Sequence, residues 1–593
     1  MGTGIVVAIT PTKAAVVIGQ STQFSAQVTN ATDTRVTWDV NGVPGGNATV
    51  GTVSPSGAYT APARVPSTPI SVMAISNADT SKSATAAVNV QGYSGVLSWH
   101  NDGGITGQNT SETLLTTGNV NQATFKKLFS YPLDDQSFAQ PLYVANVVFP
   151  GGAQRNAVYV ATASNTLYAF DADGNVKTPL WQKSLMPPGA KPVDGNTTGG
   201  IGGPITPNVG ITGTPVIDGA SGTLYAVTAT QESGGQVHRL HAIDISTGNE
   251  KFGGPVVIHA SVSGTGSGSS NGQITFDPTV QLQRCALTLV NGVVYIAWAS
   301  YQDFGSYHGW VMGYDAATLA QTAVWNSTPN GQRGGIWMSA APLSADSAGN
   351  LFLVVGNGTF DADSGGKDYG DTFVKLTPSG NNFTVSDYFT PFDQATLSAN
   401  DIDVGSSGFT MFPDQPGSVP HLGLSAGKAG KIYLLNRDNM GKFQSGSDSQ
   451  IVQSIPNALG MQPNDEDFST AVYYNGNAYF IGNGDVIKQF QLQNGLLSTS
   501  PFAKGTHVYG YPGANMSVSS NGSSNGIVWV IEASGVNVLH AYDASDVSKE
   551  LYNSSQAGSR DQFGAAIRFT VPTVVNGKVF VAGQTQLAVF GLF

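Results

Sequence analysis

The sequence has almost no cysteine. Its single cysteine, Cys285, excludes an intramolecular disulfide and any metal cluster held by several thiolates. The apolar neighbours of Cys285, Ala286 and Leu287, are typical of a small side chain in a hydrophobic core. We therefore expect Cys285 to be a buried core residue.

The sequence also lacks clusters of basic residues and long apolar runs. The formal net charge is −12, whereas a nucleic-acid-binding surface needs clustered Lys and Arg to neutralise phosphates. The longest apolar stretches, residues 5–9 and 293–299, have the length of strands and fall far short of the roughly 20 residues that cross a bilayer. We therefore expect neither a nucleic-acid partner nor a membrane span.

Charged residues are scarce, whereas glycine and proline are abundant. Only 11% of the residues are charged, and the chain contains 74 Gly and 30 Pro, which depletes helix formers and supplies many tight turns. At 593 residues, the chain is several times the size of a typical domain, so more than one folding unit is expected. This composition favours an all-β protein.

The first part of the chain, residues 1–91, alternates between short strand-like stretches and turns rich in Gly, Asn, Pro and Ser. The strands expected here are residues 16–18, 22–28, 35–40, 69–74 and 84–90. Segments 36–42 and 54–62 resemble the bacterial immunoglobulin-like repeat family. That resemblance implies a β-sandwich with Trp38 in its core, without a cross-sheet disulfide, and a spacer or adhesive role on a secreted or surface protein.

A repeat begins after the Gly/Ser-containing connection at residues 91–95. Its mark is an apolar strand that ends in Asp before a turn. Four copies are clear and four are degenerate: residues 167–171, 240–244, 311–315 and 539–543, and then residues 373–376, 432–436, 487–490 and 587–590. Residues 96–593 are therefore predicted to form a β-propeller of eight four-stranded blades, with seven blades and one irregular insertion as the alternative.

The eighth predicted blade has no outer strand of its own after residues 587–590. Residues 125–131, which precede the first blade, have the pattern of a strand and would fill that place. Such a closure removes the exposed sheet edges through which molecules could pair. We therefore predict that the ring is closed by this N-terminal strand.

The segment from Trp99 to Leu133 resembles the start of the pyrroloquinoline-quinone-dependent dehydrogenases, and a weaker likeness continues through all eight repeats. The resemblance implies a protein that oxidises alcohol or sugar hydroxyls with pyrroloquinoline quinone and Ca²⁺ at the mouth of the central channel. It also implies export to the periplasm, the cell surface or the medium. No signal peptide is recognised in the sequence, so export is an expectation only.

Two positions match the cofactor-binding motifs of this family. Residues 334–337 are similar to the stretch with the stacking tryptophan, which implies that Trp337 forms the floor beneath the quinone. Residues 427–433 resemble the segment whose basic residue donates hydrogen bonds to the quinone oxygens, which implies that role for Lys428.

Three further positions match the metal-binding and catalytic motifs. Asn357, between two glycines, resembles the family's calcium-binding asparagine, and Asp303 is a weaker match to its calcium-binding glutamate. The Asp401-Ile402-Asp403 sequence stands where the family has its general base. Of the two aspartates Asp403 is the favoured base and, with Asn357 and Asp303, a candidate metal ligand.

Two features depart from the family pattern. A single cysteine cannot form the disulfide of neighbouring cysteines that covers the quinone, and Phe138 stands where the family usually has a cofactor-contacting glutamate. One wall of the quinone pocket is therefore expected to be absent or rebuilt. The alternative is a non-enzymatic cell-surface or extracellular protein that uses the propeller to bind a glycan or a protein, with Trp337, Asn357, Asp403 and Lys428 in packing, turn or surface roles.

Other metal sites have weaker signals in the sequence. The eight histidines are scattered, and His238 and His241, the closest pair, should point to opposite faces of a strand. This spacing argues against a histidine-based metal site. The Asp-rich loop at residues 361–368 is a separate candidate for a structural calcium ion.

Overall fold

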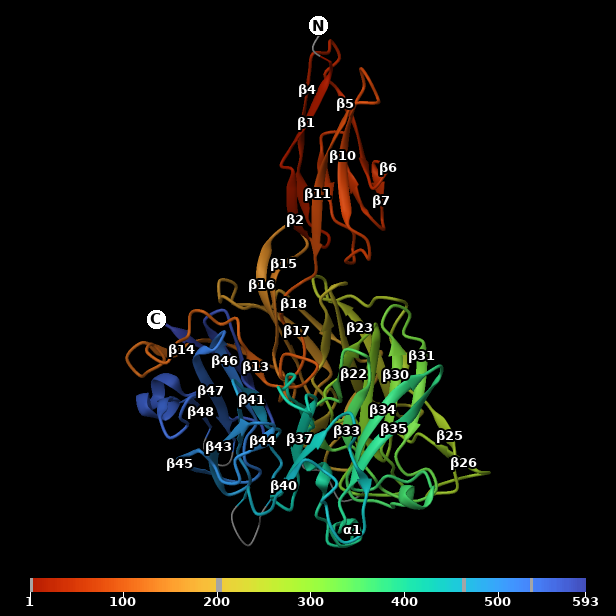
Figure 1. Ribbon diagram of the computed structural model, residues 1–593, viewed down its shortest axis with the longest axis vertical. Helices are drawn as coiled ribbons and strands as arrows, with labels where there is room; N and C mark the ends of the chain where they lie inside the picture. The colour runs from red at the N-terminus through yellow and green to blue at the C-terminus, as the bar shows by residue number, and fades with distance from the viewer. Residues whose placement is uncertain (1–3, 199–204, 461–465, 534–536) are drawn as a thin grey trace.

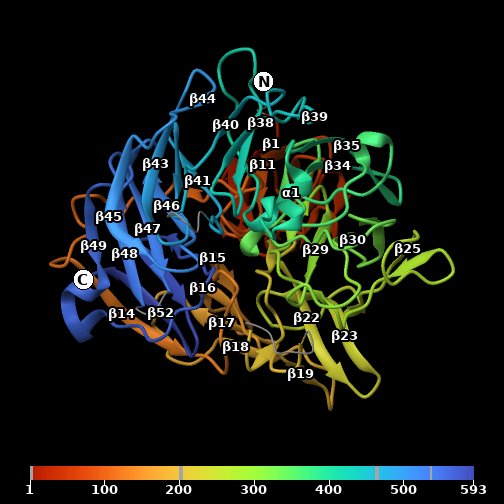
Figure 2. The same cartoon turned by 90° about the horizontal axis from the view of Figure 1, so that it is seen from below.

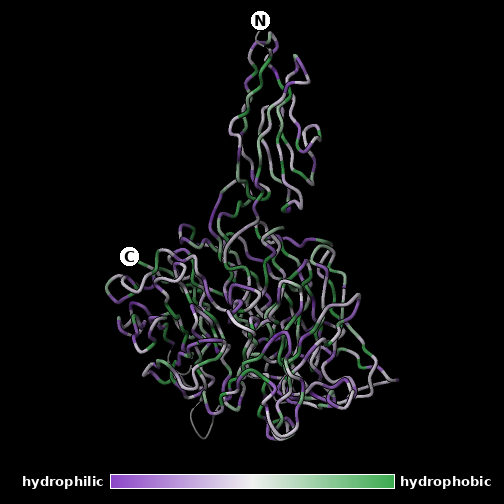
Figure 3. The backbone as a smooth tube through the Cα atoms, viewed as in Figure 1, coloured by the Kyte–Doolittle hydropathy of each residue, from purple (hydrophilic) through white to green (hydrophobic). Residues whose placement is uncertain are grey.

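The computed structural model describes residues 4–198, 205–460, 466–533 and 537–593. Nearly all of its regular structure is β, which confirms the predicted all-β class (Figure 1). Hydrophobic and hydrophilic stretches alternate along the whole backbone (Figure 3). Among the described helices, none has the length and apolar character needed to cross a membrane.

The N-terminal strands form sheets of their own at one end of the molecule (Figure 1). They are β1 (Val6–Thr10), β2 (Lys13–Val17), β3 (Ser21–Gln23), β4 (Ser25–Thr29), β5 (Val36–Val40), β6 (Val43–Pro44), β7 (Gly46–Asn47), β8 (Gly51–Val53), β9 (Ala58–Thr60), β10 (Ile70–Ser76) and β11 (Ser83–Gln91). The main sheets have the orders β2-β11-β10-β5-β6 and β3-β9-β8-β7, and side chains from both, Trp38 among them, share one core. An immunoglobulin-like assignment of this part remains a prediction.

One predicted strand in this part is wrong in its extent. Residues 22–28 form two strands that are separated at Phe24, whose side chain is fully buried. The break lets β3 pair with β9 while β4 pairs with β1 in a different sheet. The alternation of apolar and polar residues runs unbroken through both strands and hides this change of sheet.

The rest of the chain forms eight four-stranded antiparallel blades around a ring (Figure 2). Blades 1 to 4 consist of β15 (Leu142–Val148), β16 (Gln154–Ala161), β17 (Thr166–Asp171) and β18 (Trp181–Ser184); β21 (Val216–Asp218), β22 (Thr223–Glu232), β23 (Gly235–Asp244) and β24 (Val256–Val257); β28 (Thr288–Val290), β29 (Val293–Ser300), β30 (Trp310–Asp315) and β31 (Gln321–Asn326); and β32 (Ser344–Ala345), β33 (Leu351–Val354), β34 (Phe373–Ser379) and β35 (Asn382–Thr390).

Blades 5 to 8 continue the ring in the same way. They consist of β36 (Thr410–Met411), β37 (Leu422–Ala426), β38 (Ile432–Asn436) and β40 (Gln453–Ile455); β41 (Val472–Tyr474), β42 (Asn477–Phe480), β43 (Asp485–Gln493) and β45 (Ala503–Tyr509); β46 (Met516–Asn521), β47 (Ser524–Glu532), β48 (Val538–Asp543) and β49 (Glu550–Asn553); and β50 (Thr573–Val575), β51 (Lys578–Ala582), β52 (Gln586–Leu592) and β14 (Phe125–Pro132). All eight predicted repeat copies lie in strands of these blades.

Short elements connect or extend the blades. They are β12 (Gly95–Val96), β13 (Gln108–Asn109), β19 (Lys191–Asp194), β20 (Asn208–Val209), β25 (Ser261–Ser263), β26 (Gln273–Thr275), β27 (Gln281–Leu282), β39 (Lys442–Phe443), β44 (Leu496–Leu497) and the helix α1 (Gln394–Ala399). Helix α1 lies at the end of the ring away from the N-terminal sheets (Figure 1).

The strand β14 closes the ring as predicted. It pairs antiparallel with β52, from Phe125 opposite Leu592 to Pro132 opposite Gln586, and thereby becomes the outer strand of blade 8. Phe125 is fully buried and packs against Trp529. The eight-blade count and the closing strand are therefore confirmed.

The segment between β12 and β14 ties the blades together at their first strands. Backbone N–H groups from five blades donate hydrogen bonds of 2.7–2.8 Å to carbonyl oxygens of this segment: Ile217 to Leu97, Ala345 to Gly103, Met411 to Gly104, Tyr473 to Thr106, and Val518 to Gly107. These bonds mark the first strands as the inner strands of the ring. The segment therefore occupies the centre of the ring and links blades that are far apart in the sequence.

Candidate functional site

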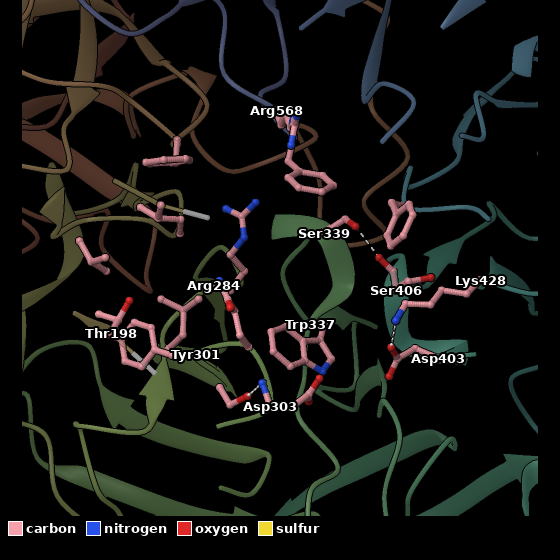
Figure 4. Close-up of a pocket in the computed structure, with 18 of the residues that line it drawn as sticks. Thr198, Arg284, Tyr301, Asp303, Trp337, Ser339, Asp403, Ser406, Lys428 and Arg568 are labelled. Atoms are coloured by element: carbon pink, nitrogen blue, oxygen red, sulfur yellow. Dashed lines mark hydrogen bonds and ion pairs between the residues drawn. The ribbon is translucent and has the colours of Figure 1, made fainter. Parts of the chain in front are cut away.

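A cavity of about 310 Å³ lies at the centre of the ring (Figure 4). Segments that lead into the first strands of all eight blades contribute to its wall, so the propeller itself gathers these residues. They include Phe138, Thr198, Val209, Arg284, Asp303, Trp337, Ser339, Asp403, Ser406, Lys428, Phe468, Tyr511, Arg568 and Phe569. The volume is at the lower end of the range that is typical of small-molecule sites.

Trp337 presents a partly exposed ring to this cavity. The three residues after it, Met338, Ser339 and Ala340, have φ angles of 40°, 46° and 75°, in the left-handed region that residues with a Cβ rarely adopt. Each such residue costs about 1–3 kcal/mol and persists only where surrounding contacts enforce it. Here Ser339 Oγ donates a hydrogen bond to the carbonyl oxygen of Ser406. The strained turn fixes the chain directly behind the tryptophan.

Asp403 and Lys428 form a buried ion pair on the same wall. The distance from Lys428 Nζ to Asp403 Oδ2 is 2.6 Å, and Lys428 Nζ also lies 3.2 Å from Asp401 Oδ2. The backbone N–H of Lys428 donates a hydrogen bond to the carbonyl oxygen of Asp403 at 2.9 Å. These contacts hold the ammonium group and the carboxylate in a fixed relative position.

Asn357 is buried next to this ion pair, on the side of Asp403 away from the cavity, and does not line the cavity itself. Its backbone N–H donates to Asp403 Oδ1 at 2.8 Å, and its side-chain amide donates to Asp401 Oδ1 at 2.8 Å. The side-chain oxygen of Asn357 is buried and has no hydrogen-bond partner among the described residues. An unsatisfied buried carbonyl oxygen beside carboxylates is a donor that a cation could use.

Gly356 explains how closely Trp337 and Asp403 approach each other. A Cβ atom at this position would lie 2.6 Å from Asp403 Oδ1 and 2.8 Å from Trp337 Cδ1. Both distances are too short for a real contact, so only glycine fits between the two side chains. Gly356 therefore allows the close approach of Trp337 and Asp403, and the N–H of Asn357 binds the Asp403 carboxylate.

Burial dominates the protonation equilibria in this region. It raises the pKa of Asp403 above the ordinary value, although the Lys428 ammonium and the N–H of Asn357 act in the opposite direction. Burial, followed by repulsion from Asp403, raises the pKa of Asp371 well above its ordinary value. Burial disfavours the charged form of Lys428, but attraction to Asp403 and Asp401 outweighs it and raises the pKa of Lys428. The group as a whole holds protons more tightly than exposed carboxylates do.

Asp303 reaches the cavity from blade 3. Its carboxylate accepts a hydrogen bond from the Tyr307 hydroxyl, and the Tyr307 ring meets Trp337 nearly edge-on with 6.5 Å between the ring centroids. Burial raises the pKa of Tyr307, and the charges of Asp303 and Asp403 raise it further. The structure therefore brings Trp337, Asn357, Asp403 and Lys428 together, while Asp303 enters the same cavity bound to Tyr307.

The motifs in the sequence missed two arginines. Arg284 is buried, and its Nη1 has no hydrogen-bond partner among the described residues. Its guanidinium lies 4.9 Å from the ring centroid of Phe569 and 5.8 Å from that of Phe138, while Arg568 lies over Tyr511. Burial lowers the pKa of Arg284 to about 10, so it stays charged near neutral pH. A buried arginine without a carboxylate partner indicates a site for an anionic ligand.

The part of the cavity wall around Phe138 is aromatic. Phe138 lines the cavity beneath Arg284 and so gives that cation a ring face. Cys285, next to Arg284, is fully buried and free, as expected for a core residue. The only advance signal for Arg284 was a lone cation inside the largely apolar stretch at residues 282–287.

Asp467, which precedes the cavity residue Phe468, should make stability depend on pH. It is completely buried, its Oδ1 accepts hydrogen bonds from Ser469, and its Oδ2 has no partner among the described residues. Burial raises its pKa to about 7. The native state then keeps a proton that the unfolded state releases near pH 4, so the contribution of Asp467 to stability falls as the pH rises from 4 to 7.

We expect the Asp467→Asn variant to lose this pH dependence. The effect corresponds to roughly 4 kcal/mol of free energy of unfolding over the whole range, of which roughly 2–3 kcal/mol falls between pH 5 and pH 7.5. Thermal melts of both proteins at pH 5 and pH 7.5 give the change in stability between the two pH values, and this change is then compared between the wild type and the variant. The wild-type protein should lose more stability than the variant on going to pH 7.5, and equal losses would contradict the assignment.

Comparisons with known proteins support the fold. A quinohemoprotein alcohol dehydrogenase from Pseudomonas putida HK5 superimposes with a TM-score of 0.55 at 14% sequence identity, over 84% of this chain and 80% of its own. A europium-containing methanol dehydrogenase superimposes with a TM-score of 0.54 at 14% identity, over 84% of this chain and 98% of its own. A scan against models of protein families gives no match, and a search of curated proteins gives none either. The likeness shows the fold, a β-propeller of the kind found in quinoprotein dehydrogenases.

Proposed function

We propose that this protein is a quinoprotein-type dehydrogenase that oxidises an alcohol or sugar hydroxyl in the central cavity, with pyrroloquinoline quinone and Ca²⁺. The observation that carries the proposal is the convergence on one cavity of Trp337, the Asp403–Lys428 pair and Arg284, whose Nη1 has no hydrogen-bond partner among the described residues. These groups offer an aromatic face, a base and cations for an anionic ligand. The structural likeness to two alcohol dehydrogenases supports the same reading.

The donor set fits a flat aromatic cofactor that carries carboxylates. Trp337 offers a partly exposed ring for stacking, and Arg284 and Arg568 offer guanidinium groups for carboxylates. Lys428, held in place by Asp403 and Asp401, would supply a positive charge near a quinone oxygen. Phe138 and Phe569 add aromatic faces to the cavity wall beside Arg284.

Oxygen ligands for a hard cation lie on this wall and directly behind it. The unpaired oxygen of Asn357 and the carboxylates of Asp403 and Asp303 are the oxygen ligands that Ca²⁺ prefers. A bound divalent cation would also satisfy the one buried polar atom of Asn357 that lacks a partner. Asp371, which repels Asp403 electrostatically, adds negative charge beside this position.

In this proposal the bound quinone supplies the acceptor for the two electrons that leave the substrate carbon. Asp403 accepts the proton of the substrate hydroxyl, and its raised pKa makes it a stronger base than an exposed aspartate. Lys428 holds the carboxylate ionised and oriented before the proton moves. The aromatic wall excludes water from the reacting groups.

The proposed location of the protein is outside the cytoplasm. We assign it to the periplasm or the cell surface, with the N-terminal sheets at residues 4–91 as a spacer. The resemblance of segments 36–42 and 54–62 to surface-protein repeats supports this assignment. These sheets lie at the end of the ring away from α1 (Figure 1).

A second candidate function is a non-enzymatic one in which the cavity binds a glycan. Five aromatic rings besides Trp337 line it, which suits sugar stacking: Phe138, Tyr301, Phe468, Tyr511 and Phe569. The missing disulfide favours this candidate as well. It predicts sugar binding without any turnover.

Reconstitution of the full-length chain with pyrroloquinoline quinone and Ca²⁺ tests the proposal. Calorimetry should show one quinone bound per chain, and dye reduction should follow addition of an alcohol or a sugar. The Arg284→Gln variant should bind the quinone at least about tenfold more weakly, because it loses a charge-assisted contact worth roughly 1.5–3 kcal/mol. The exposed Arg35→Gln variant is the matched control and should bind like the wild type.

Absence of quinone binding, or equal affinity in the Arg284 and Arg35 variants, would contradict the proposal. Sugar binding without dye reduction would favour the glycan-binding function instead.

A further inference from the structure

Three side chains of the kind that binds metals meet outside the central cavity. His507 lies on β45 of blade 6, while Glu532 and His540 lie on β47 and β48 of blade 7. One ligand atom from each of the three side chains lies within 4.8 Å of the other two. None of these residues lines the central cavity, so the cluster is separate from the proposed quinone site.

The register of blade 7 explains why Glu532 and His540 share one face. Glu532 pairs with Val538, and His540 pairs with Val530, so the two side chains are diagonal neighbours on the antiparallel pair β47–β48. His507 then approaches from the outer strand of the neighbouring blade. Although His507 and Glu532 are 25 residues apart in the sequence, their side chains meet at 3.1 Å between Nε2 and Oε2.

Two distances within the cluster are those of neighbouring ligands in a tetrahedral metal site. His507 Nε2 and His540 Nε2 lie 3.1 Å and 3.4 Å from the same oxygen, Glu532 Oε2. For metal–ligand bonds of about 2.0–2.1 Å, two ligand atoms of a tetrahedron are about 3.3 Å apart. Two histidines with one carboxylate form a recurrent ligand set for Zn²⁺.

A carboxylate already orients one of the histidines. Glu550 Oε1 lies 2.7 Å from His540 Nδ1, so the Nε2 atom of His540 faces Glu532. In metal sites, such a carboxylate fixes the ring orientation and raises the basicity of the ligating histidine. The rings of Tyr509 and Tyr542 pack near the His540 ring, at 5.4 and 6.1 Å between centroids, and restrict its movement.

Two residues of the cluster are buried and the third is exposed, an arrangement that suits a bound ion. The side chains of His540 and Glu532 are only 1% and 6% exposed, whereas His507 is 40% exposed. An ion could therefore enter from the side of His507, and water could complete its coordination. The two imidazoles select against Ca²⁺ and Mg²⁺, which prefer oxygen ligands.

We propose that His507, Glu532 and His540 bind one Zn²⁺ ion, or another divalent transition metal, at the junction of blades 6 and 7. The ion would add a link between two blades that packing and hydrogen bonds, such as the one between the Tyr509 and Tyr542 hydroxyls, already hold together, and Glu550 would position His540. The site is independent of the proposed dehydrogenase activity because it shares no residue with the central cavity.

Zinc titration of the full-length chain after chelator treatment tests this proposal. Calorimetry should give one Zn²⁺ per chain with at least micromolar affinity, and Zn²⁺ should raise the melting temperature. The exposed position of His507 makes His507→Ala the safest ligand variant, and it should bind at least tenfold more weakly. The Glu550→Gln variant should lose 10- to 100-fold in affinity if Glu550 orients His540.

The His259→Ala variant is the matched control, because His259 lies on the surface and outside the cluster. It should bind Zn²⁺ like the wild type. No binding by the wild type, or equal affinity in the His507 and His259 variants, would overturn the proposal.

Co²⁺ provides a test that needs no variant. The wild-type protein should give the strong visible absorption of a four-coordinate Co²⁺ site, and Zn²⁺ should displace it. A spectrum no different from that of aqueous Co²⁺ would show that the cluster is only a pair of histidines bound to a carboxylate.

Discussion

Replacing Asp403 by Asn should lower kcat for quinone-dependent alcohol or sugar oxidation by about 10²- to 10⁴-fold, the usual contribution of a general base. Asn has nearly the same shape but cannot accept the hydroxyl proton. The stacking ring of Trp337 and the guanidinium of Arg284 remain in the variant, so quinone affinity should change by only a few-fold. Steady-state dye reduction and quinone calorimetry on the same preparations measure the two quantities.

Asp401→Asn is the matched control for this prediction. Asp401 also lies close to Lys428, but its side chain is 68% exposed and it is not part of the cavity wall. The variant should therefore retain most of the activity. If the Asp401 variant loses turnover while the Asp403 variant keeps it, the base has been assigned to the wrong aspartate of the pair.

The pH profile gives a second view of the same carboxylate. A general base works only when it is ionised, so kcat/KM should fall as the pH falls through the pKa of Asp403. Burial raises that pKa, so the fall should occur at a higher pH than for an exposed aspartate. The Asp403→Asn variant should lack this limb of the profile.

The fold could be predicted from the sequence because its signals are local. The repeated strand recurs in every blade, ends in Asp in four of them, and lies in each case where the repeat placed it, from β17 to β52. The closing strand β14 was predictable because the eighth repeat had no outer strand of its own. The split at Phe24 was not, because an apolar pattern of period two does not show where a strand leaves one sheet for another.

Some residues of the candidate site could likewise be predicted from the sequence, and others could not. Trp337, Asn357, Asp403 and Lys428 stand in short motifs, and the structure brings them together around Gly356 and the ion pair. Arg284 has no motif, since its importance comes from burial and from the lack of a partner, which only the folded chain reveals. The cluster of His507, Glu532 and His540 depends on register and on the contact of two blades. The spacing of the histidines in the sequence therefore argued against a histidine-based metal site, whereas the fold brings two of them together.

Removal of residues 1–132 should prevent the ring from folding cooperatively, whereas removal of residues 1–91 should leave its melting temperature within a few degrees of that of the full-length chain. The longer truncation deletes β14 and the central segment that bonds to five blades. It would expose the edge of β52 and leave a cavity where Phe125 packs against Trp529.

The shorter truncation is the control because it leaves every strand of the eight blades in place. The contacts that it removes are few, such as the hydrogen bond from the Val65 N–H to the Ala220 carbonyl oxygen. Circular dichroism melts and size-exclusion chromatography compare the two chains. Since closing a ring needs its last pair of strands, a chain that begins after residue 132 should aggregate or melt without a sharp transition. A melting curve that matches that of the shorter truncation would show that the eight blades hold together without β14.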